Sequence, residues 1–164
     1  MKRFLALLLT FALFLPLLGC HSQDSGDTVF YYCRNTEDYR YFEENSVVCP
    51  EERDLTGHQN DLRYMVGLYL AGPLDEELHS PFSASTRLIS VKMDGQSVFI
   101  ELSDQTGVLN EPEFTLACAC LTLSCMRFIS CTDVTITSAE RSITMNEDSI
   151  VLFDSLPMQE TTGG

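Results

Sequence analysis

The chain has 164 residues, a length that suits one domain and is short for two. Hydrophobic residues make up 45% of it and charged residues 21%, which is typical of a globular protein and too apolar for a disordered one. With 24 acidic and 10 basic residues, the formal net charge is −14. This charge excludes nucleic-acid binding, because phosphate backbones are bound by clustered lysine and arginine side chains.

The first 19 residues have the pattern of a signal peptide. Lys2 and Arg3 give a positive start, and an apolar run of 15 residues extends from Phe4 to Leu18. As a helix this run would span about 22 Å, which is short of the roughly 30 Å hydrocarbon core of a membrane. It therefore favours a secretory signal over a transmembrane helix. Once the signal is removed, eight basic residues face 24 acidic ones, and the net charge of the mature chain becomes −16.

The signal ends in Leu17-Leu18-Gly19-Cys20, which resembles the lipobox of bacterial lipoproteins. The resemblance implies cleavage before Cys20, attachment of diacylglycerol to its sulfur, and anchoring by fatty acyl chains such as palmitate. Two such chains hold a protein on a membrane, whereas a single chain exchanges. Residues 20–27 are polar and are predicted to form a lipidated tether at the extracytoplasmic face of the cell membrane. The alternative interpretation is an ordinary cleaved signal with a chance cysteine.

The predicted domain covers residues 28–154 and starts with a strand at 28–32, where the residues are β-branched and aromatic. A less regular extended segment follows at 39–48 and ends at Cys49-Pro50. Polar residues at 51–60 predict a loop.

The first predicted helix begins after Asp61, a suitable N-cap residue, and ends at Gly72-Pro73. Its apolar positions have the spacing of one buried stripe, at Leu62, Met65, Val66, Tyr69 and Leu70.

The clearest local pattern lies in the second half of the chain. Residues 87–93 and 97–102 alternate in polarity and flank Asp94-Gly95, a dipeptide typical of a hairpin turn. Pro112 suits the first turn of a second helix, which continues to about Phe128 and is apolar nearly all round. Such a helix is predicted to be a central element of the core.

Two further strands are predicted at residues 133–137 and 149–153, before a flexible tail at 155–164. Strands, a helix, a hairpin, a helix and strands in this order predict an α+β domain. We expect a two-layer sandwich, in which a mixed sheet of about four to six strands is covered by the two helices.

An ordered set of short motifs resembles the GerMN domain of spore germination and sporulation proteins. The first helix ends in Leu70-Ala71-Gly72-Pro73, where the family has a leucine, a small residue and Gly-Pro. Thr86–Val91, the Asp94-Gly95 turn and Val98–Ser103 then follow the family's order of a threonine, a leucine pair, Ser-Val, Asp-Gly and a strand closing in Asp-Leu-Ser. The resemblance runs from about Val29 to Thr137.

This resemblance implies an extracytoplasmic α+β domain that is carried on lipoproteins and is similar in topology to the ring-building modules of secretion and sporulation channels. It also implies an interaction or assembly role in the cell envelope, linked in some members to engulfment, germination or the spore envelope. The family has no established catalytic residues or cofactor that could be carried over to this chain.

The cysteines of the mature domain invite a metal or disulfide hypothesis. Cys118, Cys120 and Cys125 lie on the second predicted helix, where their sulfurs diverge, so neither a disulfide among them nor a shared zinc site is expected. We interpret them as small buried apolar residues. A bridge between Cys33 and Cys49 stays open, although a simple hairpin would not place them opposite each other.

No other pattern indicates chemistry. Adjacent carboxylates such as Glu51-Glu52 are typical of a solvated acidic surface, and the clusters Asp24/Asp27 and Asn146–Asp148 lack the spacing of a calcium loop. The histidines share no spacing and stand at His21, His58 and His79. We therefore predict no catalytic residue, no metal site and no cofactor. The lipid attachment site Cys20 is the one predicted site residue.

Two function hypotheses result. The first is a non-catalytic lipoprotein, anchored through Cys20, that acts as a protein-interaction or assembly module of the envelope, in sporulation or germination. Its sheet edge could pair with a partner protein, and its charge of −16 disfavours a ring of identical subunits. The alternative is an extracytoplasmic lipoprotein that binds a cationic or cell-wall-derived ligand. An enzyme ranks third.

The substitution Cys20→Ala removes the sulfur that would carry the lipid. We expect this variant to move from the membrane fraction to the soluble fraction, because buried acyl chains contribute roughly 0.8 kcal/mol per CH₂ to membrane binding. Cell fractionation and immunoblotting measure the change, and Cys49→Ala is a control that keeps the lipobox intact. Retention of the Cys20→Ala protein on the membrane would contradict the lipid anchor.

Overall fold

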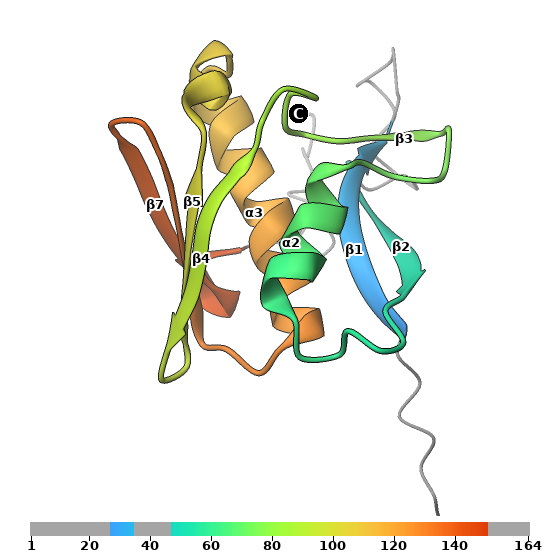
Figure 1. Cartoon of the computed structure of the whole chain (residues 1–164). Coiled ribbons are helices and arrows are strands. Elements are labelled where there is room, and N and C mark those ends of the chain that lie inside the picture. The colour runs from blue at the N-terminus through green and yellow to red at the C-terminus, as the bar shows by residue number, and fades with distance from the viewer. Residues whose placement is uncertain (1–26, 35–46, 151–164) are drawn as a thin grey trace, which may run out of the picture.

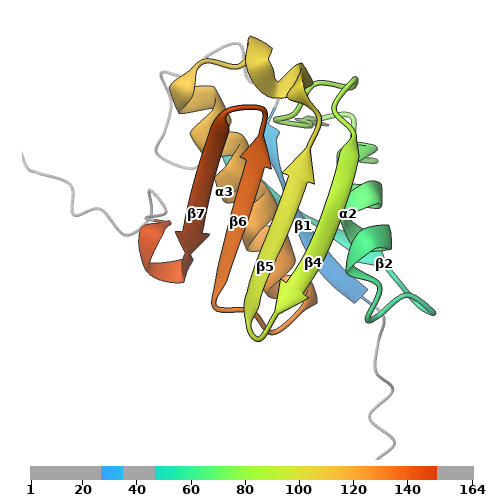
Figure 2. The same ribbon diagram turned by 60° about the vertical axis from the view of Figure 1, so that its left-hand side comes forward.

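The computed structural model describes residues 27–34 and 47–150, which form two β-sheets with two α-helices between them (Figure 1). The strand order is β2-β1-β3 in the small sheet and β4-β5-β6-β7 in the large sheet. Turning the molecule brings the large sheet to the front, with α2 and α3 behind it and the small sheet further back (Figure 2).

The small sheet is antiparallel, and the large sheet is mixed because β5 and β6 run parallel. The strands are β1 (Asp27–Arg34), β2 (Val48–Asp54), β3 (Leu78–His79), β4 (Leu88–Asp94), β5 (Ser97–Leu102), β6 (Asp133–Ser138) and β7 (Arg141–Asn146). The helices are α2 (Leu62–Leu70) and α3 (Glu111–Phe128), with short 3₁₀ turns η2 (Asp104–Val108) and η3 (Glu147–Ser149).

The α+β class and the mixed sheet are confirmed. The structure differs from the expected pair of layers, because β1, β2 and β3 form a sheet of their own on the far side of the helices. The reason lies in α3, which packs on β1 with one side and on β6 and β7 with another. A helix that is apolar nearly all round needs cover on two sides. Its buried residues are Phe114, Ala117, Cys118, Cys120, Leu121, Thr122, Ser124 and Cys125.

The predicted hairpin is confirmed as β4 and β5. The two-residue turn lies at Gly95-Gln96, one residue beyond the predicted dipeptide, and Gly95 has φ +60°, as the first position of a type II′ turn requires. Leu88 pairs with Leu102 and Ser90 with Glu101, so Ile89 is the extra residue of a β-bulge. The apolar side chains of β5 face the helices, as expected from their alternation.

Both predicted helices begin at the predicted places. The Asp61 carboxylate caps α2 by accepting from the Tyr64 amide at 2.9 Å. Gly72, at φ +98°, follows the C-cap of α2 in a conformation that favours glycine. Asn110 caps α3 and forms a reciprocal capping box with Glu113, while Pro112 occupies the first turn.

Three strands were not predicted from the sequence, namely β2, the two-residue β3 and β7. A loop was predicted at residues 51–60, yet Glu51 to Asp54 belong to β2 and pair with β1. The charge of Arg53 is neutralised by Glu51 within the strand, which allows it to be buried. β7 follows a turn that contains no glycine, and Ala139 supplies the positive φ, +52°, instead.

Several predictions lie outside the described residues. They include the signal peptide at 1–19, the tether as far as Gly26, and the tail at 155–164. Asp27, the last residue of the predicted tether, begins β1. Of the strand predicted at 149–153, Ser149 ends η3 and the last three residues are not described.

The capping box predicts a measurable loss when Asn110 is truncated. Asn110→Ala should lower the free energy of unfolding by about 1 kcal/mol, because the Glu113 amide loses its acceptor. Asn110→Asp keeps an acceptor oxygen and should be nearly neutral. Urea denaturation of both variants measures the difference, and equal losses for alanine and aspartate would show that the cap does not stabilise α3.

Candidate functional site

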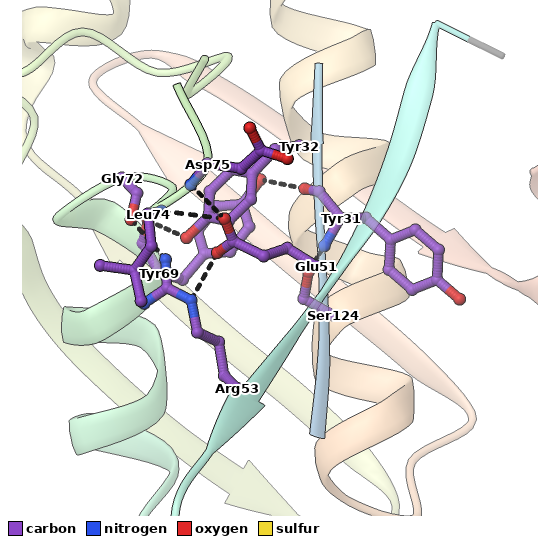
Figure 3. Close-up of polar contacts among 9 residues, drawn as sticks. All are labelled: Tyr31, Tyr32, Glu51, Arg53, Tyr69, Gly72, Leu74, Asp75 and Ser124. Carbon is purple, nitrogen blue, oxygen red and sulfur yellow. Dashed lines mark hydrogen bonds and ion pairs between the residues drawn. The ribbon is translucent and has the colours of Figure 1, made fainter. Parts of the chain in front are cut away.

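A network of polar groups surrounds the middle of β1 (Figure 3). Tyr31 lies opposite Pro50 of β2 in a non-hydrogen-bonded pair, because Arg34, three positions on, donates its N–H to the Val47 carbonyl and peptide groups alternate in direction along a strand. The N–H and C=O of Tyr31 therefore point away from β2. The backbone of Tyr31 bonds to the helices instead. Its N–H donates to Ser124 Oγ of α3 at 2.9 Å, and its carbonyl accepts from the Tyr69 hydroxyl of α2 at 3.1 Å. The two helices thus complete the hydrogen bonding of a strand edge that β3 covers further along.

Aromatic rings fix α2 to the small sheet. The rings of Tyr32 and Tyr69 are stacked with centroids 4.9 Å apart, and Phe30 meets Tyr69 edge-on at 5.7 Å. The Tyr32 hydroxyl donates to the Tyr69 carbonyl at 3.0 Å. Burial raises the pKa of both hydroxyls above the ordinary tyrosine value, so both stay protonated donors at neutral pH. These tyrosines serve as structural hydrogen-bond donors.

An ion pair on β2 holds the turn that follows α2. The Arg53 guanidinium donates from Nε to Glu51 Oε1 and from Nη2 to the Gly72 carbonyl, the latter at 2.9 Å. Glu51 Oε2 accepts from the amides of Leu74 and Asp75, both at 2.8 Å (Figure 3). We call this arrangement the Glu51–Arg53 clamp. It gives the Gly-Pro motif at the end of α2 a defined position against the small sheet.

The clamp is well shielded from water. The side chains of Arg53 and Glu51 are 6% and 11% exposed, and the guanidinium lies over the rings of Phe30 and Tyr32 at 5.6 and 6.0 Å. Buried charges need partners, and Glu51 and Arg53 find theirs in each other and in backbone groups of the same chain. We therefore interpret the clamp as a structural element that positions the turn, and not as a catalytic pair.

The two cysteines of the small sheet do not meet. Cys33 lies opposite Val48, whereas Cys49 lies opposite Tyr32. Adjacent positions of a strand face opposite sides of a sheet, so the two thiols point away from each other. Arg34 Nε donates to Cys49 Sγ at 3.5 Å. The structure therefore does not bring Cys33 and Cys49 together for the disulfide that the sequence left open.

The cysteines of α3 are fully buried, as predicted. Burial raises the pKa of the Cys118 thiol to about 12 and also that of Cys125 above the usual range. All six cysteines in the described part of the chain are thiols.

The remaining candidate residues stay dispersed. His58 stacks on Tyr64 at 3.7 Å near the start of α2, while His79 lies in β3. Asn146 caps η3 by accepting from the Ser149 amide at 2.8 Å. In residues 27–34 and 47–150, histidine, cysteine and carboxylate side chains form no group of three that could hold a metal ion. Cys20, His21 and Asp24 lie outside these residues.

Two cavities are relevant to ligand binding. One of about 540 Å³ lies beside the C-terminal end of α3 and is lined by Arg127, Glu147 and Asp148 among others. A smaller one of about 220 Å³ lies on the solvent face of the large sheet, where the Lys92 ammonium sits 5.8 Å from the centre of the Phe99 ring.

Neither helix of the described chain has both the length and the apolar character that crossing a membrane requires.

Comparison with known proteins shows likeness at the level of the fold. The tandem GerMN domains of the sporulation protein GerM from Bacillus subtilis match with a TM-score of 0.50 and 15% sequence identity, over 76% of this chain and 43% of that one. This chain thus spans less than half the length of the tandem structure. The crystal structure of a "putative lipoprotein" from Clostridium perfringens has a TM-score of 0.48 and 16% identity, over 74% and 87% of the two chains. No protein-family model and no curated protein matches the sequence. The chain has a GerMN-like fold, as its motifs predict.

Glu51 and Arg53 are the residues that the sequence pattern did not reveal. Glu51 was expected at a solvated acidic surface, and its side chain is instead nearly buried in the clamp. The sequence does hold one signal for this pair: Glu51 and Arg53 carry opposite charges two positions apart, and such side chains lie on the same face of a strand.

Removing one residue of the Glu51–Arg53 clamp should lower the free energy of unfolding. Arg53→Met leaves the Glu51 carboxylate buried without its charge partner, and we expect a loss of about 3–5 kcal/mol in the free energy of unfolding. The double variant Glu51→Leu/Arg53→Met should recover part of this loss, because no unpaired charge remains. Urea denaturation gives both values. A loss below about 1 kcal/mol for Arg53→Met, or a double variant less stable than the single one, would contradict the clamp.

Proposed function

We propose that this chain is a non-catalytic envelope lipoprotein, anchored to the cell membrane through Cys20, that acts as a protein-interaction or assembly module in sporulation or germination. The observation that carries the proposal is the GerMN-like fold, since one solved structure of that fold belongs to a sporulation protein. The signal peptide at residues 1–19 and the lipobox ending at Cys20 support the anchored location.

The edge of the large sheet at β4 is the surface we propose for the partner (Figure 2). Asp94 and Ser97 flank the two-residue turn as a hydrogen-bonded pair, and such pairs alternate along an antiparallel ladder. The backbone N–H and C=O groups of Val91 and Met93 therefore point outward from β4. An extended segment of another protein can add to such an edge through main-chain hydrogen bonds.

Exposed apolar side chains accompany this edge. Ile89, pushed outward by the bulge, is 52% exposed, and Met93 is 39% exposed. A bulge also ends regular pairing, so the segment available to a partner is short. This favours a specific contact with one partner strand over the indiscriminate stacking of open sheet edges.

The net charge of this chain favours a partner protein of different sequence over a second copy of the same chain. The mature chain carries a net charge of −16, and identical subunits would repel one another unless their contact surface were neutral. A neutral or basic partner strand avoids this repulsion.

The cavity beside α3 supports a second candidate function. Its volume of about 540 Å³ suits a small ligand, and its charged lining residues, two carboxylates (Glu147 and Asp148) against one guanidinium (Arg127), favour a cation. This candidate corresponds to a lipoprotein that binds a cationic or cell-wall-derived ligand.

Site-specific photo-crosslinking in living cells tests the assembly role. A photoreactive amino acid at Met93 should capture one discrete envelope protein, in vegetative or in sporulating cells, because β4 would lie against the partner. The matched control places the same group at Val108, an apolar residue of η2 that is 78% exposed. The capture should also be lost in the Cys20→Ala background.

Absence of any adduct at Met93 at every growth stage would contradict the assembly role and leave the ligand-binding candidate as the better one. Equal capture at Met93 and Val108 would contradict the choice of β4 as the contact surface.

A further inference from the structure

The outer face of the large sheet consists of polar cross-strand rows around one aromatic ring. The inner face carries the buried side chains of Val98, Ile100 and Val134, so the alternate residues point outward. Register places these outward residues in rows across β4, β5, β6 and β7: Ser90, Glu101, Thr137 and Ser142; Lys92, Phe99, Thr135 and Thr144; and Asp94, Ser97, Asp133 and Asn146. Phe99 is the one aromatic residue among them. In the described part of the chain, no helix or strand covers this face (Figure 2).

A cavity on this face lies over β4, β5 and β6. It has a volume of about 220 Å³ and is lined by Phe99, Glu101 and Thr135 among others. Cavities that bind drug-sized molecules usually measure about 300–1,000 Å³, so this one suits a single ring of a larger ligand. Phe99 is partly exposed, and the Lys92 ammonium lies 5.8 Å from the centre of its ring. A cation–π contact at an exposed site is weak, so a ligand can displace the ammonium from the ring.

Polar groups around the cavity hold one another in place. Thr135 Oγ1 and Thr144 Oγ1 are 2.8 Å apart across β6 and β7. Ser90 Oγ donates to Glu101 Oε2 at 2.9 Å across β4 and β5. A hydroxyl has one donor and two acceptor lone pairs, and a carboxylate accepts at two oxygens, so these groups keep capacity for further hydrogen bonds. The cavity therefore offers donors and acceptors in defined positions.

The charges and the scarcity of apolar groups on this face disfavour two classes of ligand. Asp94, Glu101 and Asp133 outnumber the single cation of these rows, Lys92, so the face repels polyanions. The centre of a protein–protein interface is apolar and depleted of charge, whereas this face has one ring among charged and hydroxyl groups. A neutral polyol with an apolar surface of its own suits both features.

We propose that the outer face of the large sheet binds a neutral oligosaccharide, one sugar ring of which packs on Phe99. In a sugar of the glucose configuration the ring hydroxyls are equatorial, so the two faces of the ring present C–H groups. These weakly positive groups pack on the negative face of an aromatic ring. The hydroxyls at the rim of the sugar hydrogen-bond to Glu101 and Thr135, and Lys92, displaced from the ring, donates to a sugar oxygen.

This inference goes beyond the proposed assembly role and does not depend on it. Met93, where the partner is to be crosslinked, lies between Lys92 and Asp94 in β4, so its side chain faces the opposite side of the strand. The cavity beside α3 shares no lining residue with this one. Failure of the saccharide site would therefore leave the anchor, the partner surface and the second candidate function untouched.

The test uses the anchored protein purified from membranes in a detergent that has no sugar headgroup. The probes are cellotetraose, a glucose tetramer, and chitotetraose, its N-acetylglucosamine counterpart. Each is titrated while saturation-transfer difference NMR records the contact of every sugar proton with the protein. We expect a Kd on the order of 1 mM for at least one tetramer, because the cavity holds about one ring. The C–H protons of the sugar ring should receive the strongest transfer, because they lie on Phe99.

Phe99→Ala should weaken binding about tenfold, because it removes the surface on which the sugar packs. Phe99→Tyr keeps the ring and should keep the Kd within about twofold. The matched control is Ser97→Ala, which lies on the same strand and face as Phe99 without lining the cavity and should leave the Kd unchanged. If Phe99→Ala does not fold, the exposed residue Glu101 decides the question, since Glu101→Ala removes a charged acceptor and should weaken binding about tenfold.

No transfer to either tetramer at about 10 mM would overturn the inference, since that concentration is about ten times the expected Kd. Equal Kd values for the unmodified protein and for Phe99→Ala would also overturn it, because the sugar would then bind elsewhere. Tighter binding of polygalacturonate, an anionic polymer, than of both tetramers would contradict the choice of a neutral ligand.

Discussion

The hydrogen bonds of the Tyr31 backbone decide how this domain is built. The N–H and C=O of Tyr31 point away from β2, beyond the reach of the short strand β3, so these peptide groups depend on Ser124 of α3 and Tyr69 of α2. Buried peptide groups must be paired, and here side chains of two helices replace a neighbouring strand. The helices are thereby fixed on one side by the small sheet. The large sheet covers their other side, and the three layers share one core.

The sequence predicted those elements whose signals are local. The capping residues Asp61 and Asn110, the Gly95 turn and the alternation in β5 each act over a few positions, and the structure confirms them. The separate small sheet was not predicted, because strand patterns do not tell which strands pair. β7 was missed because its turn uses Ala139 in place of glycine.

The residues of the candidate site also divide into those that local sequence patterns predict and those whose roles depend on tertiary contacts. Burial of the α3 cysteines could be predicted from the apolar character of the helix. The Glu51–Arg53 clamp could not, because its partners are backbone groups of residues 72–75, about twenty positions away. Functional prediction therefore came from the motifs and the predicted signal peptide, and the structure adds the placement of the sheet edges.

The two sheets have contrasting edges, and this contrast is central to the proposed function. The edge of β1 is closed by helix side chains, while β4 is an edge strand of the large sheet and its Met93 is exposed. Native-state hydrogen exchange of these two amides tests the contrast directly. The account predicts that the Tyr31 amide exchanges only on global unfolding, and that the Met93 amide of the isolated protein exchanges at least a hundredfold faster, on the order expected for local opening. Equal exchange rates at Tyr31 and Met93 would contradict it.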